Sequence, residues 1–230
     1  MKKYDIIILV LASEEERYMN VENNGIRQTW LKNTPENVKV LFYYAGHSIE
    51  KMVGDRLFLT NSEGFQNCGY KTISAFKYLK ENNYQYKYIL RTNISSYIDI
   101  KLLINHLDNK PTEKYYDGVI GDYMGIKFCS GSGYLISNDI VDCVLDNVDI
   151  WNHHYMDDVS LSIVLSKKGI LPYGSPNTRF DITNDNFEIP INYYHYRCKD
   201  DSNPNGSRTI DINRMFKIFK LKMKSKENEI

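Results

Sequence analysis

The chain has 230 residues, of which 42% are hydrophobic and 25% are charged, as in one globular domain of substantial size. Its 29 basic and 29 acidic residues cancel, so the charge gives no basic footprint for binding nucleic acid. The four cysteines are widely spaced and form no C-x-x-C pair, which argues against a structural zinc site and predicts free thiols in a reducing cytosol.

Strands and helices are predicted to alternate along the chain. Apolar runs with the length of a strand lie at 4–12, 38–44, 56–59, 88–90, 117–123 and 127–137. Apolar residues that recur every three or four positions predict helices over 70–81, 102–107, 138–145 and 157–168. Asn138 is the predicted N-cap of the third helix, and Gly169 ends the fourth. Prolines, asparagines and glycines predict loops over 172–213.

This alternation predicts an α/β fold with a central sheet flanked by helices. We expect a single domain over 1–213, followed by a basic helix or tail over 214–230. The apolar run at 6–12 is far shorter than the ~20 residues of a membrane span, and no signal-peptide cleavage pattern follows it. A cytoplasmic protein is therefore expected. The residues expected in its core are Ile6, Ile8, Val10, Val40, Phe42, Ile89 and Val119.

A polar cluster follows the strand at 88–90 and raises the main question of function. The cluster, Arg91 to Ser96, reads Arg-Thr-Asn-Ile-Ser-Ser, and no acidic residue follows until Asp99. Open α/β sheets bind ligands at the carboxyl ends of their strands. Four segments are expected at that edge of the sheet: Ala12-Ser13, Ile26–Trp30, Arg91–Ser96 and Met156–Ser160.

Two aspartates open the last predicted helix. Asp157 and Asp158 lie in its first turn, where the positive end of the helix dipole stabilises carboxylates, so plain capping explains them as well as a functional site does. The preceding residues, Trp-Asn-His-His-Tyr at 151–155, include types that stack on sugar rings or share protons, which favours a site. His154 and Asp158 would share a helix face only if the helix began earlier, so a metal pair has little support.

The order of six segments resembles the beta-1,3-galactosyltransferase family of glycosyltransferases, which has the GT-A fold. NNGIRQTW resembles its R-x-x-I-R-x-T-W segment, and MDDVSLSIVLSKKGI resembles its E-D-V-x-x-G helix. The other four are KVLFYYAG, FQNCGYKT, YILRTNISSYIDI and CSGSGYLIS. Together the six segments lie between about residues 5 and 170.

The resemblance implies a GT-A-like domain with a mixed, mostly parallel central sheet. It also implies transfer of a hexose from a nucleotide sugar, with UDP as the expected nucleotide, to a hydroxyl of a glycan, glycolipid or glycoprotein, with inversion. Asp158 then matches the aspartate that acts as base on the acceptor, and Asp157 orients the acceptor or the base. Expected donor-binding residues are Ala12, Ser13, Arg27, Lys71, Arg91, Thr92, Asn93 and Ser95. Expected acceptor-binding residues are Trp151, His154 and Gly131.

The chain departs from the family at the metal site. Asn93, Ile94 and Ser95 stand where the family has three aspartates that hold Mn²⁺. Hard cations bind mainly through carboxylates, so Mn²⁺ or Mg²⁺ is expected to bind weakly or to be dispensable. Arg91 and Arg27 are expected to supply the positive charge for the diphosphate instead. The remaining candidate ligands for a metal are Asn93, Ser95 and His195.

Two alternatives stay open. The missing acids are compatible with a non-catalytic module that binds a nucleotide sugar or a glycan, whereas the Asp157-Asp158 pair favours an enzyme. The basic tail, in which apolar residues are interspersed, predicts either a helix packed on the domain or an interfacial helix that touches anionic lipid. A phosphate-binding protein of another kind is not supported, because the chain has no P-loop and no G-x-G-x-x-G motif.

Overall fold

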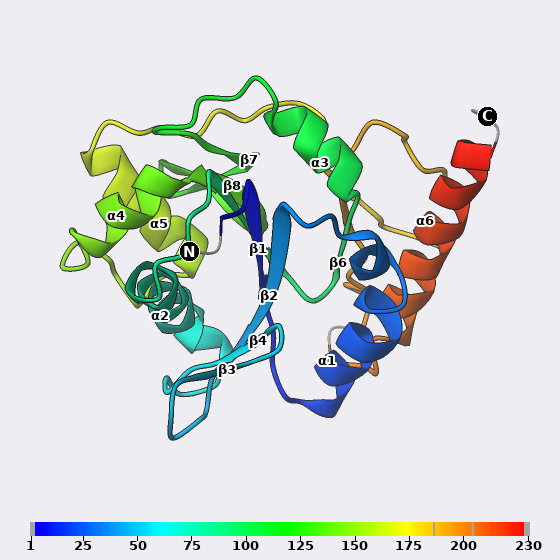
Figure 1. Cartoon of the computed structure of the whole chain (residues 1–230), viewed down its shortest axis with the longest axis horizontal. Helices are drawn as coiled ribbons and strands as arrows, with labels where there is room; N and C mark the ends of the chain where they lie inside the picture. Colours follow the sequence, from blue (N-terminus) through cyan, green and yellow to red (C-terminus); the bar gives the residue numbers. More distant parts are fainter. Residues whose placement is uncertain (1–2, 186, 204, 228–230) are drawn as a thin grey trace. The chain divides into compact units, whose positions relative to one another are not determined.

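The computed structural model describes residues 3–185, 187–203 and 205–227 (Figure 1). The chain forms two compact units, and each is assembled from three separate segments. The first unit contains residues 1–13, 35–93 and 110–176, and the second contains residues 14–34, 94–109 and 177–230. The proposed division into 1–213 and a tail over 214–230 does not coincide with these units, because the C-terminal helix belongs to the second one.

The first unit is built on a seven-stranded sheet with the order β3-β4-β2-β1-β5-β8-β7. Its strands are β1 (Ile6–Leu11), β2 (Val38–Tyr44), β3 (Lys51–Val53), β4 (Arg56–Phe58), β5 (Tyr88–Asn93), β7 (Tyr116–Tyr123) and β8 (Ile126–Ser137). Strands β4, β2, β1 and β5 are parallel, β3 and β8 are antiparallel to their neighbours, and β7 is antiparallel to β8. Five of the seven strands therefore run in one direction, which confirms the predicted mixed, mostly parallel sheet.

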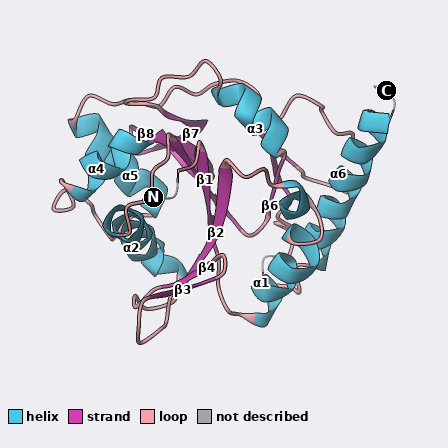
Figure 2. Ribbon diagram, viewed as in Figure 1, coloured by secondary structure: helices cyan, strands magenta, loops and turns pink. Residues whose placement is uncertain are grey.

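Helices α2 (Cys68–Glu81), α4 (Asn138–Leu145) and α5 (Asp157–Lys167) lie together beside this sheet (Figure 2). Alternate residues of the central strands, such as Ile7, Leu9 and Ile89, form one hydrophobic core with these helices. The intervening residues Ile6, Ile8 and Val10 are also buried, as expected for strands of a parallel sheet. Of the expected core residues, Val40 and Phe42 are buried as well, and the prediction is wrong only for Val119, which is half-buried.

Several element boundaries differ from the predicted ones. Strand β5 does not end at Leu90 but continues to Asn93, so Arg91 lies within the strand and shares a face with Ile89. The glycine-containing segment before α4 forms one continuous strand, β8. Ser137, and not Asn138, occupies the N-cap position of α4, because Asn138 already has helical geometry.

The second unit contains a three-stranded sheet of order β6-β10-β9 and most of its residues are helical or in loops. Its elements are α1 (Glu16–Val21), the π-helical turn η1 (Glu22–Ile26), the 3₁₀ turn η2 (Trp30–Asn33), β6 (Ser96–Ile98), α3 (Ile100–Leu107), β9 (Arg179–Asp181), β10 (His195–Arg197) and α6 (Thr209–Glu227). A further 3₁₀ turn, η3 (Phe65–Asn67), precedes α2 in the first unit. The short strands β9 and β10 and the start of α6 lie in the region predicted to be loops.

The predicted tail is a helix packed on its own unit. Ile212, Met215 and Ile218 of α6 are buried, and a Cβ added at Gly25 would lie 3.0 Å from the Met215 sulfur, so α6 and η1 are in close contact. The helix is thus packed as far as Ile218, whereas Leu221 and Met223 are exposed; residues 228–230 of the predicted tail lie outside the described part. Within the described residues, no helix combines the length and the apolar character needed to cross a bilayer.

Candidate functional site

A buried ion pair between β5 and α5 forms the centre of the candidate site. The Arg91 guanidinium lies 2.7 Å from the Asp157 carboxylate, and the two residues are 2% and 1% exposed. Arg91 Nε also donates to the Tyr43 hydroxyl at 3.1 Å, and its Nη1 donates to the carbonyl of Gly131. Arg91 is almost completely buried and its guanidinium already contacts three protein groups. A phosphate could therefore reach it only by displacing one of these groups.

Asp157 is fixed by more than this one arginine. The Thr72 hydroxyl donates to its carboxylate at 3.1 Å, and the Tyr134 hydroxyl donates at 3.5 Å. Burial raises the pKa of Tyr43 to about 12, so that hydroxyl keeps its proton at neutral pH. The Asp157 carboxylate is thus held inside the fold by donors from β5, β8 and α2, and this position excludes direct contact with a substrate.

The neighbouring carboxylate, Asp158, is different, because it is only partly buried. It accepts a hydrogen bond of 2.6 Å from the backbone N–H of Gly131 and one of 2.9 Å from the N–H of Val159. Burial, and next the negative charge of Asp157, raise its pKa above the ordinary value, although these two hydrogen bonds oppose the shift. A carboxylate with a raised pKa and an open side has the properties of a general base.

Gly131, predicted to bind an acceptor, lies directly against this pair of charges. A Cβ at this position would come within 3.0 Å of Asp158 Oδ2 and 3.3 Å of Arg91 Nη1. The glycine therefore lets strand β8 approach the start of α5 closely enough for the Gly131 N–H to reach Asp158. The structure thus joins four of the predicted site residues, Arg91, Gly131, Asp157 and Asp158, in one cluster.

A second cluster surrounds the carboxyl end of β1. The Lys71 ammonium donates to the Ala12 carbonyl at 2.8 Å and lies 3.0 Å from the Glu63 carboxylate. Lys71 is buried, and this burial lowers its pKa. Its charge is therefore matched by Glu63, whereas the sequence predicted a contact with the donor.

The carboxyl ends of β1 and β5 lie side by side, because the two strands are parallel neighbours in the sheet. Leu11 pairs with Asn93 in the parallel register, so Ala12 and Ser13 continue from the same edge at which Asn93 lies. The Thr92 side chain is directed toward β8 and not toward Ala12 and Ser13, because its hydroxyl donates to the Ser132 carbonyl at 2.8 Å. The predicted donor residues Ala12, Ser13 and Asn93 are thus neighbours within the first unit.

Three of the predicted site residues lie in the second unit, and each has a partner there. Arg27 pairs with the buried Glu22 carboxylate at 2.7 Å. The Ser95 hydroxyl donates to Asp211 at 2.6 Å. The third residue, His195, lies 2.9 Å through Nε2 from the Ser96 hydroxyl. Burial, followed by the charges of Arg179 and Arg197, places the pKa of His195 well below its ordinary value, so the ring is neutral at pH 7.

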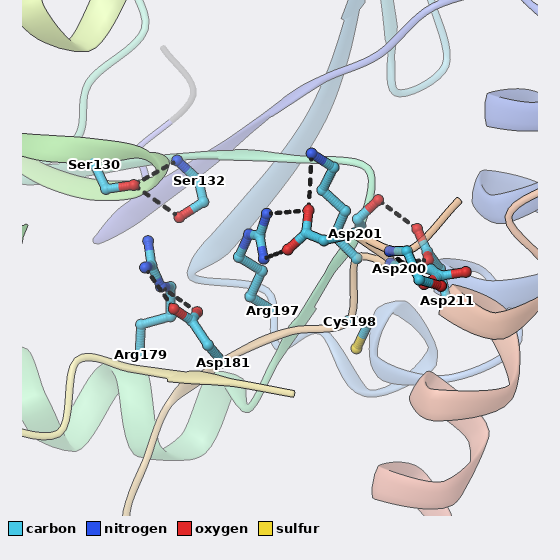
Figure 3. Close-up of polar contacts among 12 residues, drawn as sticks. Ser130, Ser132, Arg179, Asp181, Arg197, Cys198, Asp200, Asp201 and Asp211 are labelled. Atoms are coloured by element: carbon cyan, nitrogen blue, oxygen red, sulfur yellow. Dashed lines mark hydrogen bonds and ion pairs between the residues drawn. The ribbon is translucent and has the colours of Figure 1, made fainter. Parts of the chain in front are cut away.

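Two further ion pairs of the second unit each include an exposed aspartate. Figure 3 shows Arg197 facing Asp201 through two contacts, and Arg179 facing Asp181. The same figure shows Asp211 beside Asp200, whose backbone N–H donates to it at 2.8 Å. These arginines, which lie in the predicted loop region, are each engaged by a carboxylate of the same unit.

The residues that replace the family's acidic triplet do not form a metal site. Asn93 and Ser95 offer only neutral oxygens, and the Ser95 hydroxyl already donates to Asp211. Across the described ranges, no group of three or more His, Cys, Asp or Glu side chains is placed to hold a metal ion. Neutral oxygens of this kind are poor ligands for Mn²⁺ or Mg²⁺, so weak or dispensable metal binding stays a prediction.

The predicted acceptor residues Trp151 and His154 line one pocket. It is an open pocket of about 490 Å³, and its lining is Tyr70, Asp149, Ile150, Trp151, Asn152, His153 and His154. Trp151 is buried and His154 is exposed. The pocket lies at the start of α2, within the first unit.

Several residues of the cluster carry no signal that sequence reasoning used. Tyr43 belongs to an apolar strand, and nothing in that run marks its hydroxyl as a partner of Arg91. Tyr134 lies 23 residues from its partner Asp157 in the sequence. Thr72 matched the family motif together with Lys71, and this match could have identified it as a partner of the aspartates.

Comparison with models of known protein families gives no match, and comparison with curated proteins gives none. Among solved structures, the chain is similar to the galactosyltransferase LgtC in complex with donor and acceptor sugar analogs, with 13% identity over 92% of this chain and 94% of that chain and a TM-score of 0.47. It is also similar to mouse xyloside xylosyltransferase 1 in its apo form, with 6% identity over 85% of this chain and 97% of that chain and a TM-score of 0.46.

Proposed function

We propose that the protein is a glycosyltransferase that moves a hexose from a nucleotide sugar, with UDP as the expected nucleotide, to a hydroxyl of a glycan or glycoconjugate with inversion. The observation that carries the proposal is the unequal pair at the start of α5. Asp157 is closed off by Arg91, whereas Asp158 is partly exposed and has a raised pKa. The motif resemblance and the adjacent ends of β1 and β5 also support it.

In this proposal Asp158 is the catalytic base. Its free carboxylate oxygen lone pairs accept the proton of the acceptor hydroxyl while the hydroxyl oxygen forms a bond to the anomeric carbon of the donor. The bond from that carbon to the diphosphate oxygen breaks, and the nucleoside diphosphate leaves with the electron pair. Attack from the face opposite the leaving group inverts the configuration.

Asp157 and Arg91 act as positioning residues. Their ion pair joins the start of α5 to β5, and the contact of Arg91 with the Gly131 carbonyl holds the segment whose N–H binds Asp158. Arg91 thus supports the base and leaves the diphosphate to other groups. Ala12, Ser13 and Asn93 are the proposed donor-binding residues of the first unit.

The test is turnover of a UDP-hexose panel by the wild type and by Asp158→Asn. Loss of a general base typically lowers a rate about 10²–10⁴-fold, while nucleotide binding should stay nearly intact because the base acts on the acceptor. Asp108→Asn, a change at an exposed aspartate of the second unit, is the matched control and should retain full turnover. Near-normal turnover by Asp158→Asn would overturn the assignment of the base.

A non-catalytic module that binds a nucleotide sugar or a glycan is the second candidate. It is favoured by the neutral residues Asn93 and Ser95 in place of the acids and by the enclosed state of Arg91. Incubation with UDP-sugars without an acceptor separates the two candidates. An enzyme should release UDP slowly by hydrolysis, and Asp158→Asn should reduce that release, whereas a binding module should release none.

A further inference from the structure

The C-terminal half of α6 extends beyond the part of the helix that packs on the second unit. Met215 and Ile218 are buried, whereas Leu221 and Met223 are each 42% exposed. Packing of the helix therefore accounts for the apolar residues of its first half only. The second half carries charged and apolar side chains at the surface, and the proposed transfer reaction uses none of them.

Two lysines lie on one exposed side of this segment. Lys220 and Lys224 are four residues apart, so they share a helix face, and both are exposed. Neither forms an ion pair with another residue of the described ranges. Lys222, on the packed side, differs because it lies 3.0 Å from the Asp99 carboxylate. The positive charge of Lys220 and Lys224 is thus available to a partner outside the chain.

The whole helix concentrates positive charge in a chain whose total charge is zero. It contains six basic residues, Arg214, Lys217, Lys220, Lys222, Lys224 and Lys226, and two acidic ones, Asp211 and Glu227. Asp211 is buried and accepts a hydrogen bond from Ser95. The exposed Asp185 beside the helix is paired with Arg214 at 2.9 Å. Neither of these two carboxylates is therefore free to neutralise the two exposed lysines.

An apolar stripe runs beside the lysines. Phe216, Phe219 and Met223 have the i, i+3, i+7 spacing of one helix face. Both phenylalanines are half-buried and Met223 is exposed, so the stripe is partly open to solvent. Lys220 lies four residues after Phe216 and three before Met223, and it therefore borders the stripe. Positive charge and apolar surface thus occur side by side on the same part of α6.

We propose that this face of α6 binds the surface of an anionic lipid bilayer. The stripe of Phe216, Phe219 and Met223 lies at the boundary between headgroups and acyl chains, and the helix axis runs along the surface. The ammonium groups of Lys220 and Lys224 reach outward to the headgroup phosphates, because a lysine can lay its apolar stem along apolar surface and keep its charge in the polar layer.

The combination of charge and apolar surface favours a bilayer over other polyanions. A nucleic acid would attract the two lysines but would leave the stripe exposed to water. Each lysine near an anionic membrane typically strengthens binding about fivefold, so two lysines alone bind weakly and the apolar contact supplies the rest. Membrane binding does not depend on the proposed enzyme. Only the further step, in which the surface brings the protein to a glycolipid acceptor, rests on the proposed function.

The test is sedimentation of the full chain with vesicles of phosphatidylcholine, with and without one-third phosphatidylglycerol. The wild type should sediment with the anionic vesicles, and added salt should weaken this binding. Lys220→Gln combined with Lys224→Gln should weaken it about fivefold for each lysine. Lys77→Gln combined with Lys167→Gln is the matched control, because it removes two exposed lysines from the first unit and should bind as the wild type does.

A second pair of variants tests the apolar stripe. Met223→Ser should weaken binding about threefold to tenfold, because it removes the most exposed side chain of the stripe. Leu221→Ser is its matched control. Leu221 is as exposed as Met223, but a separation of two residues turns it by about 200° to the opposite side of the helix. All these sites are exposed, and thermal unfolding checks that each variant is folded.

Three outcomes would overturn the proposal. The first is the absence of sedimentation with anionic vesicles, and the second is an equal loss of binding in the Lys77 and Lys167 control. The third is a loss in the Lys220 and Lys224 variant with unchanged binding by Met223→Ser, which would replace the bilayer by another polyanion. No nucleotide sugar is present in the assay. Vesicle binding by a chain that turns over no UDP-sugar would therefore support this site and reject only the proposed enzyme.

Discussion

Each unit of the molecule contains an arginine–aspartate pair of nearly equal length. Arg91 and Asp157 in the first unit lie 2.7 Å apart, and Arg197 and Asp201 in the second lie 2.6 Å apart. The side chains of the first pair are 3% and 1% exposed, and those of the second are 20% and 58% exposed. The two pairs therefore share their chemistry and differ in their access to water.

This difference decides what each pair can do. Breaking a buried pair costs much of the folding free energy, because losing one partner leaves an uncompensated charge in the interior. An exposed pair is weakened by water and salt, and either partner can be exchanged for a solvent molecule. The two pairs have almost the same contact distance. Only the burial of the side chains shows which pair stabilises the fold and which lies at the surface.

The largest effect is expected when one partner of each pair is removed. Arg91→Met should lower the free energy of unfolding by about 3–5 kcal/mol, because Asp157 would be left buried without its charge partner. Arg197→Met should cost about 0.2–1 kcal/mol. Urea denaturation of both variants measures the two costs. Equal losses would show that burial does not distinguish the pairs.

A double variant sharpens the same comparison. Arg91→Met with Asp157→Leu removes both charges, and replacing a buried pair by apolar groups is often close to neutral. The double variant should therefore be more stable than Arg91→Met alone, in a double-mutant cycle with a strong coupling term. A double variant that is less stable than either single variant would mean that packing, and not charge, dominates at this site.

The next largest effect is expected from a substitution at Gly131, which lies against Asp158 and Arg91. Gly131→Ala places a Cβ 3.0 Å from Asp158 Oδ2, so the carboxylate or strand β8 must shift. Overpacking of this kind typically costs about 1–3 kcal/mol. Turnover should fall as well, because the Gly131 N–H no longer holds the proposed base. Unchanged stability and turnover would show that the start of α5 adapts freely.

A smaller effect is expected from Asp158 itself, and its sign depends on pH. The folded-state pKa lies above the ordinary 3.8, so the folded protein holds this proton to a higher pH than the unfolded chain does. The free energy of unfolding therefore falls as pH rises between the two pKa values, and the loss persists at neutral pH. Asp158→Asn should remove that loss.

Urea denaturation of Asp158→Asn and the wild type across this pH range measures the effect. The difference in stability should shift in favour of the variant as pH rises. Turnover by the wild type should fall as pH drops through the raised pKa, because the base becomes protonated. A difference in stability that shifts against the variant would contradict the raised pKa.

The smallest effect is expected from removing divalent metal. Asn93 and Ser95 provide no carboxylate, so EDTA should change the affinity for UDP very little. Calorimetry of UDP binding in EDTA and in Mn²⁺ measures this. Binding that vanishes in EDTA and returns with Mn²⁺ would require a metal site, and Asp99, Asp122 and His195 would be the ligands to test first.

Much of the first unit could be predicted from sequence, because its elements have strong local patterns. The run Val38 to Tyr44 is one strand as expected, and Asp157 and Gly169 delimit the last helix nearly as predicted. The short strands β9 and β10 could not be predicted, since three residues carry too little periodicity. Strand β10 pairs with β6, which lies about a hundred residues earlier in the sequence, and β9 pairs with β10.

The candidate site was predicted in its residue types and not in its contacts. The Asp157-Asp158 pair was selected from its place at a helix start and from its flanking aromatics, which are local signals, whereas the role of base for Asp158 came from the family resemblance. The enclosure of Arg91 was missed because it depends on Tyr43, Gly131 and Asp157, which come from three other elements. Because β5 continues for three residues beyond its predicted end, Arg91 lies inside the strand and not at its end.

The assembly of each unit from three separate segments has a consequence for synthesis of the chain. The second unit requires residues 14–34, which are made early, and residues after 177, which are made late. At about 5–20 residues per second, the early helix waits roughly 10–40 s for α6 to be synthesised. Met215 and Ile212 then cover surface of η1 that has been exposed until that moment. During translation this nascent chain therefore presents an apolar surface on which a chaperone could act.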